Sequence, residues 1–479
     1  MGCHAAKERR LPTSNVTDSC RPIQPKYADS FRCIGSACED TCCAGWTVPI
    51  DRATWKKYQS LPESPLRVLP LQSLIAANVV RNAECADSEA SSGAAFATIR
   101  MNSANQCPML SEERLCRIQT ELGEDLLSHA CATYPRIVHS LGGMEEKALS
   151  LSCPEAARLV LLTPNLFADA EYSGPAGGMS PSAAAGAAAA LPPHFWPIRA
   201  VVLKLVGNRL YPLWQRLFLL DILCRRLDSI TRGDLKRSIP TFLAGFEATL
   251  ASGALRAGMD ALPTGRAAQL DVVLRLAGLM LHKSNIRPRF VECIQAFTAG
   301  IGNGPGATLE SLAAHYSFAH DRLYAPFIDR HPHIMENFLI NTILRCQFPY
   351  GKDGMRAGAQ TDMAREFSLL AAQFALMRGL LIGVAGHHGP AFSGEHIVHT
   401  VQAASKHFEH HPEFLPMAHA LLVESRIDGP SGLAMLLRNP KMNQGVGESS
   451  PASAQILAAG WQDGISASAP AQQGLAQSH

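Results

Sequence analysis

Four cysteines fall within eleven residues near the start of this 479-residue chain, inside the segment FRCIGSACEDTCCAGWTVPID at positions 31–51. Five more follow at wider intervals before residue 154, of which Cys85 lies in a small, polar stretch and is a poor ligand candidate. Thiolates gathered this closely suit a soft metal ion or an iron–sulfur cluster. The residue types therefore predict a metal or cluster site built from eight cysteines. They are Cys33, Cys38, Cys42, Cys43, Cys107, Cys116, Cys131 and Cys153.

Other interpretations of these cysteines stay open. A disulfide framework is typical of small secreted domains, and we see no secretory signal here. Unrelated buried thiols are a further interpretation, because single cysteines do scatter through protein cores. Between the metals, zinc asks for four tetrahedral ligands, whereas a cubane cluster takes three or four thiolates. The spacing alone favours iron–sulfur and zinc equally.

The loop that would carry the first four cysteines has two further features. Gly35 and Gly45 supply the tight turns that a metal-binding loop needs. Cys42 and Cys43 are adjacent, so their side chains project in different directions and seldom hold the same single ion. Either one of them binds the metal while the other supports it, or each faces a different metal atom.

Composition divides the chain into a cysteine-rich first third and a helical remainder. Eleven of the fourteen cysteines precede Pro154, and the three later ones lie in apolar helical contexts. A stretch near residues 174–193 is almost entirely Gly, Ala, Ser and Pro, which predicts a linker. We expect a flexible extension (1–24), a cysteine-rich domain (25–165), a linker (166–193), a helical domain (194–438) and a disordered tail (439–479).

Hydrophobic spacing predicts a mainly α fold. Apolar residues recur at helical spacing from Phe195 onward. Short strands are expected only near the cysteines, at residues 46–50 and 96–101, and Asp51 has the position of a helix N-cap. The predicted architecture is a small cysteine-rich metal domain with few short strands, joined to a larger all-helical domain.

Charge and hydropathy exclude several classes of partner. A net charge of +2 gives no reason to expect nucleic acid or an acidic membrane surface. The longest apolar stretches are interrupted by charged residues before they reach the length of a membrane span. We therefore expect a cytoplasmic protein that binds neither nucleic acid nor membrane.

Several blocks of this sequence resemble the bacterial flagellin lysine-N-methylases, which belong to the wider zinc- or iron-chelating cysteine-cluster families. The resemblance runs roughly from Pro25 to Arg438, interrupted by the linker and by residues 84–94. It implies methyl transfer from S-adenosylmethionine to surface lysines of flagellin, by an enzyme that carries a [4Fe-4S] cluster. The blocks are the cysteine segment, 107–110, 115–119, Cys131 with 134–136, 151–156, 336–341 and 348–351.

A lysine methylase must remove a proton from an amine whose ordinary pKa is about 10.4, and must align the nitrogen with the sulfonium methyl group. Tyr134 is our candidate for an aromatic wall, and Glu336 for a base or cation partner. Arg136 could grip the donor's carboxylate, while Asn337 and Asn341 lie four apart on one helix face and could share a donor pocket. Core packing, an ordinary ion pair and a buried cap are the simpler interpretations of these residues.

The alternative function is a non-catalytic zinc or iron–sulfur binding or carrier protein. No G-x-G-x-x-G motif follows a strand, which counts against a standard Rossmann methyltransferase and favours this alternative. If the chain is a methylase, we expect the donor to bind where the cysteine-rich and helical domains meet, because pockets favour domain junctions.

Overall fold

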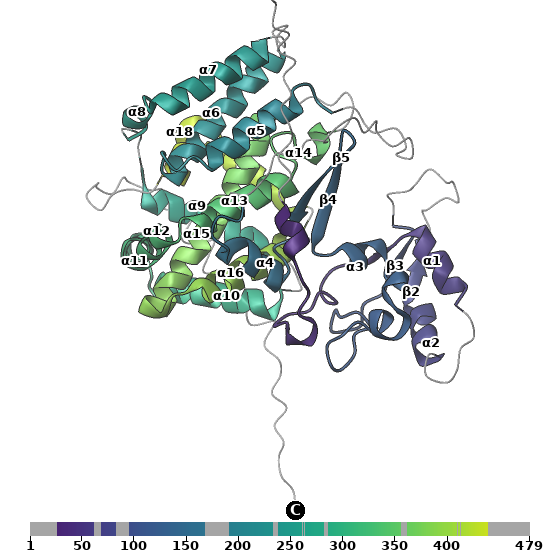
Figure 1. Cartoon of the computed structure of the whole chain (residues 1–479). Helices are drawn as coiled ribbons and strands as arrows, with labels where there is room; N and C mark the ends of the chain where they lie inside the picture. Colours follow the sequence, from purple (N-terminus) through teal and green to yellow (C-terminus); the bar gives the residue numbers. More distant parts are fainter. Residues whose placement is uncertain are drawn as a thin grey trace, which may run out of the picture.

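Most of the chain folds into helices that pack around one long central helix, with a smaller lobe carried to one side (Figure 1). The computed structural model describes residues 26–61, 69–82, 95–167, 191–232, 238–260, 262, 264–281, 286–355, 362–409, 411 and 413–438. The expectation of a mainly α fold is confirmed. The expected N-terminal extension, most of the linker and the C-terminal tail lie outside the described residues, so the predicted domain boundaries stay predictions.

The helical body occupies the left of Figure 1 and begins with α4 (Pro154–Leu162). Its remaining helices are α5 (Phe195–Val206), α6 (Leu213–Arg232), α7 (Ile239–Ser252), α8 (Arg256–Asp260), α9 (Arg266–Leu281), α10 (Pro288–Gly300), α11 (Leu309–Ala319), α12 (Ala325–Arg330), α13 (His333–Arg345), α14 (Gly351–Gly354), α15 (Met363–His388), α16 (Gly394–Phe408), α17 (Phe414–Glu424) and α18 (Pro430–Leu437).

The small lobe holds a three-stranded antiparallel sheet with strand order β1-β3-β2. Its strands are β1 (Pro49–Ile50), β2 (Val79–Arg81) and β3 (Ala97–Ile99), and its helices are α1 (Arg52–Gln59), α2 (Leu69–Asn78) and α3 (His129–Thr133). The two short strands expected near the cysteines are present. Asp51 caps α1, as expected, because its carboxylate accepts a hydrogen bond from the Thr54 N–H at 2.8 Å.

A hairpin that the sequence analysis does not predict lies between the lobe and the body (Figure 1). Strands β4 (Arg136–Leu141) and β5 (Met144–Leu149) pair with Leu141 opposite Met144. Gly142 and Gly143 both have positive φ, at 59° and 84°, which suits the two-residue turn of a tight hairpin. The hairpin is anchored to the body through a buried ion pair of Glu146 with Arg199 at 3.2 Å.

The described residues form two hydrophobic cores. The smaller one joins the short sheet to α1 and α2 and includes Ile50, Leu71 and Met109, all fully buried. The larger one runs through the helical body and also takes in the hairpin and α4. Residues 136–162 therefore pack with the helices, although they belong to the sequence's cysteine-rich third.

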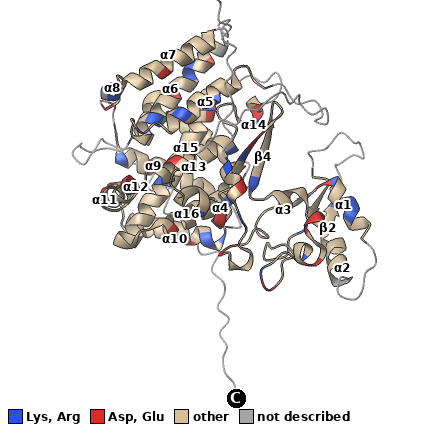
Figure 2. Cartoon of the chain, in the orientation of Figure 1, with Lys and Arg blue, Asp and Glu red and all other residues tan. Residues whose placement is uncertain are grey.

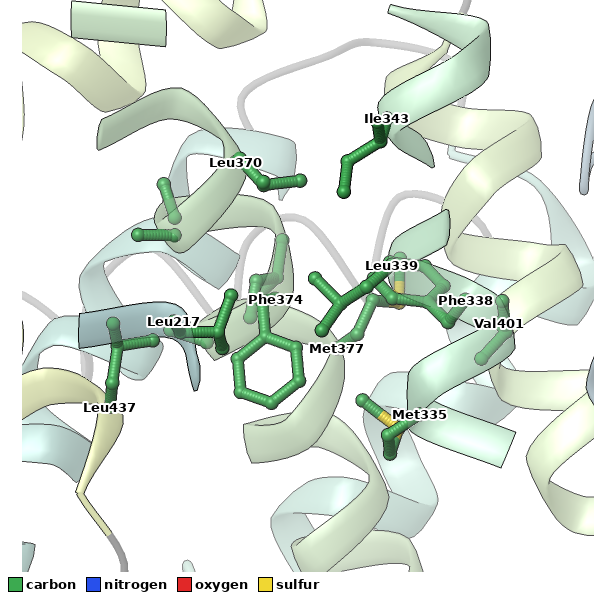
Figure 3. Packing of buried hydrophobic residues seen from close by; sticks show 14 of the residues in the cluster. Leu217, Met335, Phe338, Leu339, Ile343, Leu370, Phe374, Met377, Val401 and Leu437 are labelled. Carbon is green, nitrogen blue, oxygen red and sulfur yellow. The ribbon is translucent and has the colours of Figure 1, made fainter. Parts of the chain in front are cut away.

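Helix α15 is the centre of the larger core. Leu370, Phe374 and Met377 point from it toward side chains of α6, α13 and α18 (Figure 3). The segment Met363–Ala391 is also long and apolar enough to cross a membrane, contrary to our expectation that no apolar stretch reaches that length. Its whole apolar window is buried inside the protein, as in the core helix of a folded domain.

Close approach of α10 and α15 depends on glycines at their contact. A Cβ at Gly383 would overlap the ring of Phe297, and a Cβ at Gly300 would overlap the carbonyl oxygen of Gly383. By contrast, a Cβ at Gly278 in α9 would meet no atom within 4 Å. The two kinds of glycine should respond oppositely to the addition of one methyl group.

We predict that Gly383→Ala lowers the free energy of unfolding by about 2 kcal/mol or more, because the methyl group must push α10 away from α15. Gly278→Ala is the matched control and should raise it by about 0.5–1 kcal/mol, since alanine is the better helix former. Urea unfolding of both variants measures the difference. Equal effects of the same sign would show that the packing of α10 on α15 is not as tight as described.

Candidate functional site

The cysteine loop, defined here as residues 33–46, lies between the small lobe and the helical body. Gly35 and Gly45 have φ of 59° and 83°, so both expected turns are present. The end of the loop is tied to the small lobe, because the Cys43 carbonyl accepts a hydrogen bond from the Cys107 N–H at 2.7 Å and the Gly45 N–H donates to the Asn105 carbonyl at 2.9 Å.

One group of cysteines packs on the core of the small lobe: Cys43, Cys107, Cys116 and Cys131. The Cys43 thiol shares hydrogen bonds with Cys42 and Cys116. These bonds lower the pKa of Cys116 to about 6 and that of Cys42 to about 7, against the effect of burial. Burial raises the pKa of Cys107 to about 11 and that of Cys131 to about 12.

The other cysteines lie toward the helical body. Cys153 is buried in the larger core, where it is the N-cap residue of α4. Burial raises its pKa to about 12, and the neighbouring charges of Cys38 and Cys42 add to that rise. Burial likewise raises the pKa of Cys38, with a smaller contribution from Cys33. Cys42 is therefore the link between the two groups.

The eight cysteines have the donor chemistry of a thiolate-bound centre. All eight are free thiols, and pairwise electrostatic interactions connect each of them to at least one other where the loop, the small lobe and α4 come together. Within the described ranges, no group of three or more His, Cys, Asp or Glu side chains is arranged to hold a metal ion. The donor types thus fit a soft metal or cluster, while the identity of the metal and of its direct ligands stays a prediction.

Asp40, in the middle of the cysteine loop, binds the loop to α16. Lys406 donates from Nζ to the Asp40 carboxylate and to the Thr41 carbonyl, both at 2.7 Å. Gln402, one turn earlier, donates to the same carboxylate at 2.8 Å and to the Ser152 carbonyl at 3.0 Å. Burial raises the pKa of Asp40, but the Lys406 charge and these hydrogen bonds outweigh it and hold the pKa below its ordinary value.

A cluster of ion pairs at the edge of the loop makes a second attachment. Arg158 on α4 contacts Glu39 at 2.8 Å, Glu155 at 2.6 Å and Glu395 at 3.3 Å. Both acidic and basic segments are visible around α4, α10 and α16 in Figure 2. The loop is thus bonded to α4 and α16 of the body as well as to the small lobe.

Arg287, the N-cap residue of α10, faces the same loop. Its guanidinium lies directly against Gly45, where any Cβ would overlap it. Its Nη1 atom is buried and has no hydrogen-bond partner among the residues that the structure describes. Burial lowers the pKa of Arg287, and the charge of Asp40 opposes that shift.

Of the two predicted catalytic residues, Tyr134 contacts the cysteine loop in the described structure. Its ring stacks on Trp46 of the cysteine loop, with centroids 6.2 Å apart. Its hydroxyl lies 3.1 Å from Ser152 Oγ, which lies 2.6 Å from Ser150 Oγ. Ser150 donates to the carboxylate of Glu409, whose side chain is only 6% exposed. Burial raises the pKa of Tyr134 well above its ordinary value.

Two of the other predicted site residues form charged contacts elsewhere. Arg136 donates to the Phe31 carbonyl at 2.9 Å and lies over the Phe31 ring. Glu336 pairs with Arg209 at 3.0 Å and with the buried Arg216 at 2.8 Å. The predicted roles of Arg136 in donor binding and of Glu336 in catalysis stay predictions.

The two predicted asparagines join separate elements. Asn337 donates to the Val160 and Thr163 carbonyls at the end of α4, at 2.8 and 2.9 Å. Asn341 continues the hairpin, because it accepts from the Leu149 N–H at 3.1 Å and donates to the Leu149 carbonyl at 2.9 Å. A shared donor pocket for Asn337 and Asn341 likewise stays a prediction.

Sequence reasoning missed Asp40, Arg287, Gln402, Lys406 and Glu409. Asp40 lies among the cysteines, and Lys406 is a charged residue on the apolar face of an amphipathic helix. Each position therefore gives a weak indication in the sequence that the residue is functional. Their pairing gives none, because 366 positions separate them.

A separate cavity of about 630 Å³ opens between α6, α7 and α8 and is lined mainly by apolar side chains such as Phe218, Phe242 and Met259. Its polar lining is limited to Arg226, Thr241 and Thr249. The small lobe and these helices lie at opposite sides of Figure 1. The cavity therefore carries none of the groups that the cysteine chemistry would use.

Comparison with known proteins gives consistent matches. The FliB lysine N-methylase C-terminal domain matches residues 199–436. The chain is 34% identical over 146 residues to the flagellar biosynthetic protein FliU of Salmonella muenchen, which covers 30% of this chain and 79% of FliU. It is also 34% identical over 149 residues to the lysine-N-methylases of Salmonella typhimurium and Salmonella choleraesuis, which is 31% of this chain but only 34% of each relative. No solved structure matches at a significant level.

Breaking the pair of Lys406 with Asp40 should loosen the cysteine loop. Their side chains are 7% and 15% exposed, so Lys406→Met leaves a buried carboxylate without its cation and should cost about 3 kcal/mol of unfolding free energy. Lys204→Met removes an exposed pair, with side chains 71% and 35% exposed, and should cost less than about 0.5 kcal/mol.

Urea unfolding measures both costs. Adding Asp40→Asn to Lys406→Met should recover most of the loss, because the remaining amide needs no cation. A Lys406→Met protein as stable as the parent would contradict the assignment of this pair as the attachment of the loop.

Proposed function

This chain belongs to the FliB family of lysine-N-methylases, which are protein-lysine methyltransferases, and from that premise we propose that it transfers methyl groups from S-adenosylmethionine to surface lysines of flagellin in the cytoplasm. The observation that carries the proposal is the family match over residues 199–436. These residues form most of the helical body, which holds the cysteine loop in place beside Tyr134. The aligned part of the chain covers about a third of the named lysine-N-methylases.

In the proposed reaction the lysine amine enters along Trp46 and Tyr134. The stacked rings offer an apolar wall beside which a cation can lie before it loses its proton. Because the donor's sulfonium is also positive, an amine that has been stripped of water and of its proton attacks the methyl group more readily. The Trp46–Tyr134 pair would thus hold the amine at the junction of loop and body.

We assign the removal of that proton to a hydrogen-bonded chain. The amine gives its proton to the Tyr134 oxygen while the Tyr134 hydroxyl proton passes to Ser152, the Ser152 proton to Ser150 and the Ser150 proton to the Glu409 carboxylate. The neutral amine then forms a bond to the methyl carbon as the carbon–sulfur bond breaks. The sulfide leaves uncharged, and the methylated nitrogen carries the positive charge.

We further propose that three or four of the eight cysteines hold a [4Fe-4S] cluster and that the others support it. The support is their donor chemistry: the Cys43 thiol is hydrogen-bonded to both Cys42 and Cys116, and Cys107 and Cys131 are near enough to interact electrostatically with them. When bound, such a cluster cross-links the loop to the small lobe and supplies an iron–sulfur centre. Cys33, Cys38 and Cys153 would complete the ligand set or support it from the side of the body.

The cluster proposal predicts that protein prepared without oxygen is brown and contains iron and sulfide. Cys116→Ser, and likewise Cys33→Ser or Cys38→Ser, should lose colour because each removes a thiolate near the centre. Cys293→Ser is the control, since Cys293 is buried in α10 and distant in sequence from the loop; it should keep the colour. A colourless, zinc-loaded wild type with full methyl transfer would show that the metal is zinc.

The proton-transfer chain predicts that Tyr134→Phe lowers methyl transfer to purified flagellin by about 100-fold while the iron content stays unchanged. Tyr316→Phe removes a buried hydroxyl that has no hydrogen-bond partner among the described residues, and it should leave transfer unaffected. Initial rates with labelled S-adenosylmethionine provide the measurement. Normal transfer by Tyr134→Phe would exclude this tyrosine from proton removal.

A further inference from the structure

Arg287 has a buried hydrogen-bond donor that no described residue of the protein accepts. Its Nη1 is shielded from water and meets no acceptor within the described ranges. Leaving such a donor unpaired costs about 1–3 kcal/mol, and more for a charged group. Among the described residues this guanidinium atom therefore has a hydrogen bond left to give, which a bound ligand could accept.

The charges around Arg287 indicate that this acceptor is an anion. Asp40 is the nearby acid, and it already accepts from Lys406 and Gln402. The described carboxylates form no ion pair with Arg287, whereas Lys406 stands close enough for the Arg287 charge to act on it. Lys406 and the half-buried Arg287 thus lie near the same carboxylate, and only Lys406 forms an ion pair with it.

The residues around Arg287 indicate where a bound anion would lie. Gly45 lets the guanidinium rest on the backbone of the cysteine loop, and a side chain at this position would displace it. Tyr134, which is uncharged because burial raises its pKa, is one of the groups that surround Arg287. The unused donor is thus beside the tyrosine to which we assign contact with the reacting amine.

We propose that Arg287 binds the carboxylate of the methionine portion of the methyl donor. A guanidinium offers two parallel N–H groups to a carboxylate, and this contact is strong where water is excluded. The inference rests on the proposed function and deepens it, because it orients the donor with its sulfonium toward Tyr134. Arg136 is less suited to the same role, since its Nη2 donates to the Phe31 carbonyl.

Two nucleosides test this assignment on the full chain prepared without oxygen. S-adenosylhomocysteine keeps the carboxylate, whereas 5′-methylthioadenosine lacks the whole amino-acid portion. By calorimetry, Arg287→Gln should weaken S-adenosylhomocysteine binding by about tenfold or more and change 5′-methylthioadenosine binding less than about twofold. Arg287→Lys keeps the charge but not the paired donors and should fall between the parent and Arg287→Gln.

Arg275→Gln is the control, because Arg275 donates to Ser425 in a different part of the body, and it should bind both nucleosides like the parent. Unchanged S-adenosylhomocysteine binding by Arg287→Gln would overturn the inference alone. An equal loss of affinity for both nucleosides would show that the residue is structural and would also overturn the inference. The same holds if Arg287→Gln and Arg287→Lys both lose their colour and have a lower melting temperature. A parent protein that binds neither nucleoside would overturn the proposed function together with this inference.

Discussion

The arrangement of this protein depends on a buried ion pair between a loop and a helix that are far apart in the sequence. Lys406 and Gln402 of α16 hold Asp40, and Asp40 holds the run of cysteines against the helical body. The neighbouring cysteines are simultaneously bonded to the small lobe. Because a buried carboxylate is costly without its cation, this ion pair stabilises the loop in the position described. That position brings Tyr134, Trp46 and Arg287 to the thiols.

This dependence explains why the chemistry would sit at a junction rather than in a preformed cavity of the body. The small lobe contributes the thiols of Cys107, Cys116 and Cys131, on which Cys43 of the loop packs, while the body contributes Cys153, Arg287 and the α16 residues. Neither part has the complete set. The hairpin β4–β5 spans the two and leads directly into Ser150 and Ser152, so its attachment to Arg199 and Asn341 also fixes the proposed proton path.

Sequence reasoning found the residues whose chemistry is local and missed those defined by long-range contacts. The cysteines, the cap at Asp51 and the helical body follow from spacing and composition. The hairpin does not, because Glu145, Glu146 and Lys147 interrupt any apolar alternation and Glu146 is buried only by virtue of Arg199. The polar residues of α13 that the sequence indicated as a site are buried in the structure. Their partners, such as Leu149 for Asn341, could not be inferred from spacing.

We propose, above all, that the methyl donor binds at the junction of the cysteine loop with α10 and α16. The most direct measurement is a crystal structure of the protein, grown without oxygen and soaked with S-adenosylhomocysteine. We expect ligand density beside Arg287, Gly45 and Tyr134, with the sulfur toward the tyrosine. Ligand density in the apolar cavity between α6 and α7, with the junction empty, would contradict it.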